Sequence, residues 1–341
     1  MPDNSIFKKV DVNCMELFGA IPSRKERLAA SGSARHYYRL IFPDKSLILC
    51  VSDNIEENKT FIALSHYLYN NEVNVPEIYK VDSGYKWYLL QDLGDTDFLS
   101  MLSQKMGDKF KGDEIENIFR QLVKFQFLPE GEWKNLVEFP QLDRELIFYD
   151  FNYAVNNLFI VSGLKYDERG LNTDFEKLAS KLQSLPQSLW GLMYRDFQSR
   201  NIMIYEGKPY FIDYQSARKG PCIYDFVSFA WQAKAGFSNN ERIKLTNIYV
   251  DCLKTAGVKA AENVKEHIPY WALFRIIQTL GAYGLRGLKE GKPHFIQSIP
   301  PAVGNARELM ETSSLSGEFP EIYSSIKQLV NRYEQSQSIK V

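Results

Sequence analysis

An aspartate, an asparagine five residues later, and a second aspartate at the end of a short apolar run constrain this chain more than any other feature. They are Asp196, Asn201 and Asp213. Between the last two, residues 203–212 predict two short strands joined by a turn at 206–209. Such a hairpin would return Asp213 to the side of Asn201. Two oxygen ligands would then meet where a hard cation such as Mg²⁺ can bind.

The same layout is typical of the catalytic loop of protein kinases. There the loop aspartate accepts the proton of the substrate hydroxyl, while the asparagine and the later aspartate hold Mg²⁺. One aspartate in a loop is usually a turn former or a cap. Three polar residues in this order, with a hairpin between them, indicate a shared site. We therefore expect Asp196 to be the base, Asn201 and Asp213 to be metal ligands, and ATP and Mg²⁺ to be the cofactors.

Composition agrees with an ordinary enzyme and excludes several other classes. The 341 residues are 45% hydrophobic and carry a formal net charge of −1, so charge gives no reason to expect nucleic acid or a membrane surface as partner. No apolar run approaches the roughly 18 residues of a membrane span, and the first residues lack a signal-peptide core. The four cysteines are scattered. We expect them to be reduced and the protein to be cytoplasmic.

The order of elements before residue 94 predicts a small sheet. Strands are expected at 36–42 and 47–51, then a helix opened by a capping box at 53–56, and then strands at 75–79 and 85–90. Strand, strand, helix, strand, strand is the order of the N-terminal lobe of a kinase.

From residue 94 onward the chain is expected to be mainly helical. One helix is predicted from Asp113, and a capping box at 173–176 predicts another that ends before Pro186. The expected fold is α+β and protein-kinase-like, with two lobes. Residues 1–93 would form the N-lobe, with a small antiparallel sheet, and residues 94–341 a mainly helical C-lobe.

Two segments of the N-lobe are expected to bind the nucleotide. The turn containing Gly32 and Ser33 lies between two predicted strand segments, where backbone N–H groups can contact phosphate oxygens. The backbone of Gln91 and Leu93, where the last strand runs into a hinge, would pair with the adenine edge.

The cation that should grip the phosphates is missing from its usual place. A kinase carries a lysine in its third strand, whereas the matching strand here has none, and Cys50 and Ser52 lie roughly at that point. Arg35, Arg39 and Lys45 are the alternatives, and the sequence does not choose among them. Of these, Arg35 ends the predicted phosphate-covering segment at 31–35 and is expected to contact the nucleotide.

Three segments carry a family resemblance: Tyr-Arg-Asp-Phe-Gln-Ser-Arg-Asn at 194–201, Ile-Asp-Tyr-Gln-Ser-Ala-Arg at 212–218, and Gly-Pro-Cys-Ile-Tyr-Asp at 220–225. They resemble the aminoglycoside phosphotransferase and choline kinase superfamily, most closely its bacterial anomeric N-acetylmuramate/N-acetylglucosamine 1-kinases. The similarity covers most of the chain. It implies a kinase of cell-wall recycling that also lacks the strand lysine, with Asp225 bracing the catalytic loop.

The acceptor is expected to be a small neutral or anionic sugar. Residues 262–308, expected to wall the acceptor pocket, carry six lysines and arginines against four acids, the wrong sign for a polycation such as an aminoglycoside. The protein is expected to act as a monomer. The alternatives are a kinase of another small alcohol and an inactive kinase-fold binding protein. The polar residues expected to contact sugar hydroxyls are Arg195, Gln198, Arg200, Gln215 and Arg218.

Overall fold

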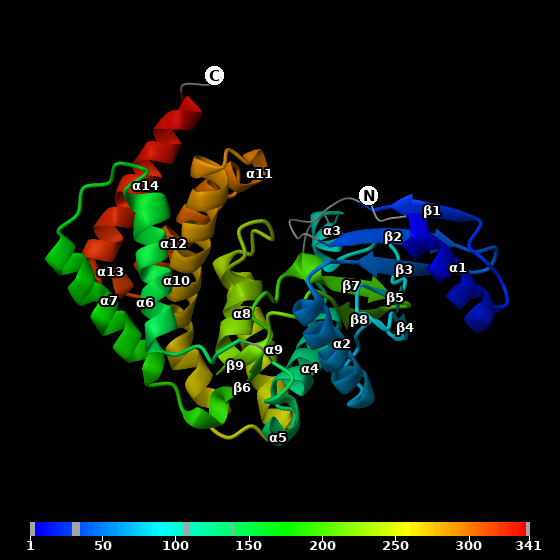
Figure 1. The fold of residues 1–341 in the computed structure, drawn as a ribbon. Helices are drawn as coiled ribbons and strands as arrows, with labels where there is room; N and C mark the ends of the chain where they lie inside the picture. Colours follow the sequence, from blue (N-terminus) through cyan, green and yellow to red (C-terminus); the bar gives the residue numbers. More distant parts are fainter. Residues whose placement is uncertain (1–3, 29–34, 105–109, 138, 339–341) are drawn as a thin grey trace. The chain divides into compact units, whose positions relative to one another are not determined.

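The computed structural model describes residues 4–28, 35–104, 110–137 and 139–338 and divides the chain into two compact units (Figure 1). The first, here called the sheet unit, comprises residues 1–98, 128–138 and 201–216. The second, the helical unit, comprises residues 99–127, 139–200 and 217–341. The predicted hairpin after the catalytic loop thus belongs to the sheet unit. Gly32 and Ser33, expected to contact phosphates, lie outside the described residues.

The sheet unit is built on a five-stranded sheet in the order β1-β2-β3-β5-β4. Every neighbouring pair is antiparallel, which confirms the predicted sheet. Strand β4 begins at Ile78, whereas the sequence predicted that this strand would begin at residue 75 and end at residue 79. The sequence analysis did not predict β1. The strands are β1 (Arg24–Arg27), β2 (His36–Ile41), β3 (Ser46–Val51), β4 (Ile78–Val81) and β5 (Trp87–Gln91).

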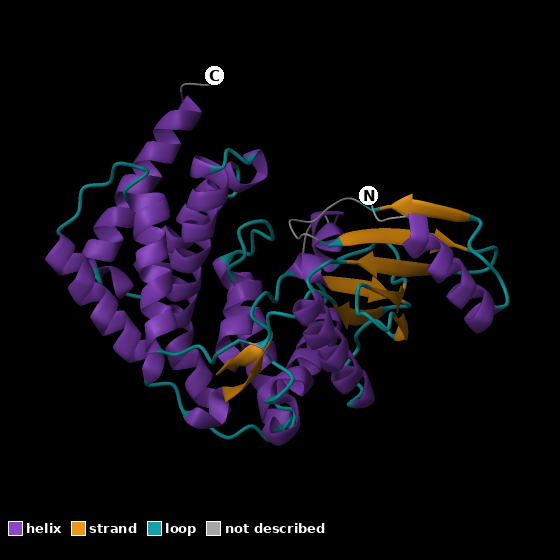
Figure 2. Cartoon of the chain, in the orientation of Figure 1, coloured by secondary structure: helices purple, strands orange, loops and turns teal. Residues whose placement is uncertain are grey.

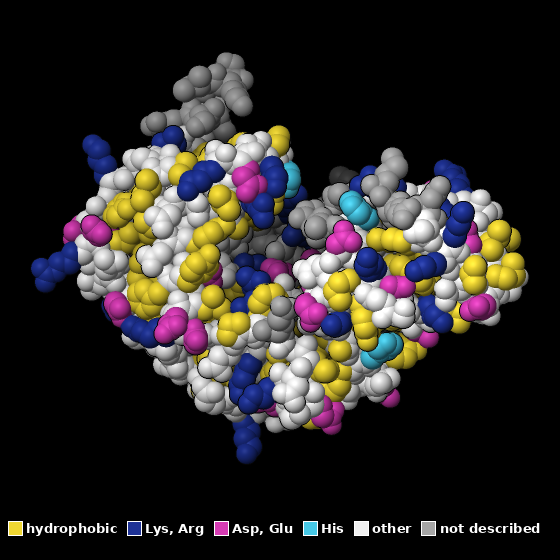
Figure 3. Space-filling view, viewed as in Figure 1, with side chains coloured by type: hydrophobic (Ala, Val, Ile, Leu, Met, Phe, Trp, Pro, Cys, Tyr) yellow, Lys and Arg dark blue, Asp and Glu magenta, His cyan; other side chains and the backbone are white. Residues whose placement is uncertain are grey.

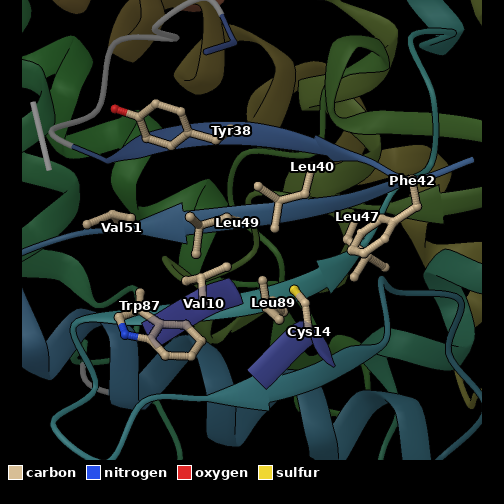
Figure 4. Close-up of a cluster of buried hydrophobic side chains, with 10 residues drawn as sticks. All are labelled: Val10, Cys14, Tyr38, Leu40, Phe42, Leu47, Leu49, Val51, Trp87 and Leu89. Atoms are coloured by element: carbon tan, nitrogen blue, oxygen red, sulfur yellow. The ribbon is translucent and has the colours of Figure 1, made fainter. Parts of the chain in front are cut away.

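One face of this sheet is covered by α1 (Asn4–Phe18), a helix that the sequence analysis also missed. Its buried side chains Val10 and Cys14 join a cluster with alternate residues of the strands, among them Leu40, Leu49 and Leu89 (Figure 4). Because side chains alternate along a strand, Tyr37, Cys50 and Tyr88 occupy the alternate positions and face away from α1. These three residues are register partners on β2, β3 and β5.

Helix α2 (Ile55–Asn70) and the hairpin pack together in the same unit. The side chain of Asn54 caps α2 by accepting the N–H of Glu57, within the box predicted at 53–56. The ring of Phe61 stacks on Tyr88 and on Tyr214, with 5.3 Å between ring centroids in both pairs. These contacts tie α2 to the sheet and to the segment that carries Asp213.

The predicted hairpin is present as β7 (Ile202–Tyr205) and β8 (Lys208–Phe211). Its turn is shorter than predicted, because Tyr205 pairs directly with Lys208. The two turn residues, Glu206 and Gly207, have φ values of +49° and +73°, which suit a tight two-residue hairpin turn.

Helices make up most of the helical unit (Figure 2). The capping box predicted at 173–176 is wrong. Helix α7 begins at Glu168, and the side chain of Asp167 caps it by accepting the N–H groups of Arg169 and Gly170. Asp174 lies inside that helix, where its buried carboxylate accepts the N–H groups of Glu321 and Ile322. The helix ends at Gln183, before Pro186 as predicted.

Two strands and the remaining helices complete the chain. Among the described residues, no helix is long and apolar enough to cross a membrane. Basic and acidic side chains are interspersed on the surface seen in Figure 3. The further elements are β6 (Trp190–Met193), β9 (Arg218–Pro221), α3 (Phe98–Gln104), α4 (Gly112–Gln126), α5 (Glu130–Trp133), α6 (Arg144–Ala154), α8 (Cys222–Ala230), α9 (Asn239–Thr255), α10 (Val264–Tyr283), α11 (Pro293–Ile296), α12 (Ile299–Thr312), α13 (Leu315–Glu318), α14 (Pro320–Ser338), the π-helical segments η1 (Val155–Phe159) and η5 (Gly284–Lys289), and the 3₁₀ turns η2 (Gln187–Leu189), η3 (Ser199–Asn201) and η4 (Ala261–Asn263).

Candidate active site

Asp225, on α8, braces the start of the catalytic loop. Its carboxylate accepts the backbone N–H of Tyr194 at 2.9 Å and that of Arg195 at 2.8 Å. Burial raises the pKa of Asp225 to about 7, and the hydrogen bonds that it accepts oppose that rise. Because a buried carboxylate needs donors on its oxygens, these bonds fix the loop to α8. The contact is the one that the family resemblance implied.

Strand β6, which leads into the catalytic loop, packs closely against the end of α4. A side-chain Cβ at Gly191, on β6, would lie only 2.1 Å from the carbonyl oxygen of Gln126, so this position accepts only glycine without a shift of the backbone. The close approach lets the Gln126 amide donate to Asp225 and to the carbonyl of Cys222, each at 2.8 Å. Arg195 has a φ of +78°, an unusual conformation for a residue with a side chain, directly before Asp196.

Asp196 lies beside a partly buried arginine that the sequence analysis counted only in the charge of residues 262–308. Nη2 of Arg275, on α10, is 3.6 Å from Oδ1 of Asp196. The Arg275 guanidinium also lies over the ring of Tyr224, 5.3 Å from its centroid. No local pattern could have predicted this pair, because it depends on how α10 packs against α8.

The predicted substrate residues of the helical unit lie in different surroundings. Gln198 lines a small cavity together with Arg275. Arg200 is exposed, in η3. Arg218 is buried on β9, with its guanidinium 4.6 Å from the centroid of the Phe139 ring. Burial, together with the nearby positive charge of Arg195, lowers the pKa of Arg218 to about 10.

In the sheet unit, Asn201 and Asp213 lie at the open end of the hairpin. The N–H of Ile212 donates to the carbonyl of Asn201 at 3.1 Å, which brings the two expected metal ligands beside each other. Asp213 is exposed and has a φ of +68°. Gln215, expected to contact the sugar, instead donates its side-chain amide to Oδ1 of Asp213 at 2.9 Å. Gln215 therefore orients the Asp213 carboxylate.

The chemistry of these two side chains fits Mg²⁺. This ion typically uses one or two protein carboxylates together with waters and substrate phosphates, rather than a cage of protein ligands. The described part of the chain has no group of three or more His, Cys, Asp or Glu residues that could hold a metal. A carboxylate at Asp213 and an amide at Asn201 suffice when phosphate oxygens and waters complete the shell.

Of the three candidate cations, Arg35 is the one paired with a glutamate of the neighbouring helix. Its side chain is buried, and its Nη2 lies 3.0 Å from Oε1 of Glu57 on α2. In kinases, the strand lysine pairs with a glutamate of the neighbouring helix in the same manner. Tyr37, the register partner of Cys50, interacts with both Arg35 and Asp213. The main cause that raises the pKa of Tyr37 is its burial.

The two other candidate cations have different contacts. Arg39 pairs with Asp92 at 2.6 Å and with Asp95 at 2.8 Å. Lys45 lies over the ring of Phe18, 4.0 Å from its centroid. In the sheet, Arg39 is the register partner of Ile48, whereas Tyr37 is that of Cys50.

The segment expected to contact adenine is only partly available for that role. The N–H of Gln91 donates to the carbonyl of Glu77 at 2.8 Å, inside the sheet unit. An adenine contact in this segment would therefore have to use another backbone group. Leu93 follows β5 and is buried.

Comparison with known proteins identifies the family of this chain. The model of the phosphotransferase enzyme family matches residues 26–251. A Neisseria meningitidis protein named N-acetylmuramate/N-acetylglucosamine kinase is 25% identical over 314 residues, which are 90% of each chain. A Pseudomonas putida protein of the same name is 25% identical over 313 residues, 88% of this chain and 90% of that one.

Solved structures confirm the protein-kinase-like α+β fold. A choline/ethanolamine kinase family protein from Mesorhizobium loti matches with a TM-score of 0.60 at 13% identity, over 95% of this chain and 98% of that one. The ADP-bound aminoglycoside phosphotransferase APH(2'')-Ib matches with a TM-score of 0.59 at 13% identity, over 91% and 97%. The family model covers more than half of the residues of this chain. The chain therefore belongs to the phosphotransferase enzyme family and is a phosphotransferase with an alcohol group as acceptor.

Proposed function

We propose that this chain is an ATP- and Mg²⁺-dependent kinase of an N-acetylated amino sugar, N-acetylglucosamine or N-acetylmuramic acid, acting at the anomeric hydroxyl. The observation that carries the proposal is the pairing of Asp196 with Arg275 beside a cavity that no acidic side chain lines. A cationic wall suits a neutral or anionic sugar and disfavours a polycation. Two relatives named for these sugars, each matching about nine-tenths of the chain, support the same substrates.

Each site residue then has a defined task. Asp196 accepts the proton of the anomeric hydroxyl as its oxygen attacks the γ-phosphorus. A new P–O bond forms, the bond to the bridging β–γ oxygen breaks, and ADP leaves with that electron pair. Asn201 and Asp213 would hold Mg²⁺, which when bound would supply charge neutralisation for the phosphates, and Arg35 would bind a phosphate oxygen.

The setting follows from this chemistry. An enzyme that consumes ATP and an amino sugar released from cell-wall material would work in the cytoplasm, in cell-wall recycling. One copy of the chain carries all the residues that the proposed reaction uses, so a monomer suffices. Neither nucleic acid nor a membrane is needed as a partner.

A screen of acceptors tests the proposal. With Mg·ATP, we expect ADP release with N-acetylglucosamine or N-acetylmuramic acid to exceed that with kanamycin by about 100-fold in kcat/KM. The reason is that bringing a polycation next to Arg275 costs several kcal/mol of like-charge repulsion. Reactions with EDTA serve as the control and should show no sugar-dependent ADP release.

Two outcomes would contradict the proposed substrate. Faster turnover of kanamycin or another cationic alcohol would make the chain a kinase of a different acceptor. Binding of Mg·ATP without turnover of any acceptor would favour a kinase-fold binding protein.

A further inference from the structure

The cavity that Arg275 lines is small and has two kinds of wall. It is much smaller than a whole sugar ring, and it lies within the helical unit. One wall is apolar and includes Ala233, Ile276 and Ala302. The polar lining residues are Gln198, Ser228, Gln232, Arg275, Thr279 and Tyr283. A group with one polar and one apolar end fits such a lining.

Arg275 is held in one orientation at this cavity. Its Nε donates to Oγ of Ser228 and its Nη1 to Oε1 of Gln278, each at 2.8 Å. The amide of Gln278 in turn donates to the buried carboxylate of Asp150. These contacts direct Nη2 toward Asp196, at 3.6 Å, a separation too long for a hydrogen bond. Nη2 is therefore placed to donate to a ligand atom beside the base.

We propose that Arg275 donates to the carbonyl oxygen of the acceptor's 2-acetamido group and thereby selects N-acetylated over unsubstituted sugars. The inference rests on the proposed function, in which Asp196 contacts the hydroxyl on C1. The exocyclic substituent nearest to that hydroxyl is the one on C2. A guanidinium only donates hydrogen bonds and is always charged, so it favours a carbonyl oxygen and repels a 2-ammonium group. The acetyl methyl would lie against the apolar wall.

The expected effect is large because the donor is charged and preorganised. A site built to hydrogen-bond one substrate group discriminates strongly against analogues that lack it. We expect wild-type kcat/KM for N-acetylglucosamine to exceed that for glucose by roughly 100-fold, and that for glucosamine by at least as much.

The test changes the side chain at position 275 and the substituent on C2 of the sugar, separately and together, and compares the effects. Values of kcat/KM are measured for wild type and Arg275→Lys with N-acetylglucosamine and with glucose. Lysine keeps the charge but loses the planar fork of donors. The substitution should lower kcat/KM for N-acetylglucosamine by about 10–100-fold and that for glucose by less than about threefold. Titration calorimetry of N-acetylglucosamine, with a non-hydrolysable ATP analogue present, should show weaker binding to the variant.

The control is Arg120→Lys, the same exchange at an exposed arginine of α4 that pairs with Glu116, and it should leave both values unchanged. Equal losses for both sugars would mean that Arg275 acts only by positioning Asp196, and would overturn the inference alone. Should the Arg275 variant fail to fold, the wild-type ratio still decides, since equal kcat/KM for glucose and N-acetylglucosamine would also overturn it. If wild type turned over neither N-acetylglucosamine nor N-acetylmuramic acid, the proposed function would fall and the inference with it.

Discussion

Replacing Asp196 with Asn should lower kcat by about two to four orders of magnitude, while Mg·ATP still binds with nearly unchanged affinity. General-base catalysis contributes roughly 10²–10⁴-fold, and this group acts mainly in the transition state. The amide keeps one oxygen that can face Arg275, so the substitution removes the base while disturbing the packing little. We would measure kcat with N-acetylglucosamine and ATP affinity with a fluorescent nucleotide.

A matched variant separates the loss of the base from a general effect of removing a charge. Asp251→Asn changes an exposed carboxylate on α9, in the same compact unit, and should retain full activity. An Asp196→Asn enzyme with more than about a tenth of the wild-type kcat would exclude Asp196 as the base.

Asp213→Ala should weaken metal-dependent nucleotide binding more than Asn201→Ala does. A carboxylate is the stronger ligand for a hard dication, because an amide oxygen offers only a dipole. The side chain of Asp213 is also more exposed than that of Asn201, and Gln215 orients it. We expect the Kd for Mg·ATP to rise by about 10–100-fold in the first variant and by less in the second.

Nucleotide binding in EDTA provides the reference for both variants, because it should differ little between them and wild type. The titrations are repeated over a range of Mg²⁺ concentrations. Mild effects of equal size in the two variants would place the metal site elsewhere.

The parts of the site that the sequence predicted are those held together by local geometry. A two-strand hairpin connects Asn201 to Asp213. Its strands show in the sequence as two short apolar runs, at 203–205 and 210–212, on either side of a turn. The bracing by Asp225 was accessible only through the family resemblance, because its partners Tyr194 and Arg195 are about 30 residues away in sequence.

Other parts depend on contacts between distant segments and could not be predicted. Arg275 reaches Asp196 only because α10 packs beside α8. Arg35 is favoured over Arg39 and Lys45 as the phosphate-binding cation because it pairs with Glu57. The sequence does not show this ion pair. At Asp174, the local capping pattern was misleading, because the carboxylate instead satisfies the first N–H groups of α14.

The most direct test of the central claim is the position of the phosphate on the product. An anomeric hydroxyl is more acidic than a primary alcohol, so a carboxylate base such as Asp196 needs less help to remove its proton. Wild-type protein is incubated with Mg·ATP and N-acetylglucosamine or N-acetylmuramic acid, and phosphorus–proton coupling in the product is read by NMR. We predict coupling of the phosphorus to the anomeric proton, with an ester that hydrolyses readily in acid; coupling to the protons on C6, in an acid-stable ester, would contradict the account.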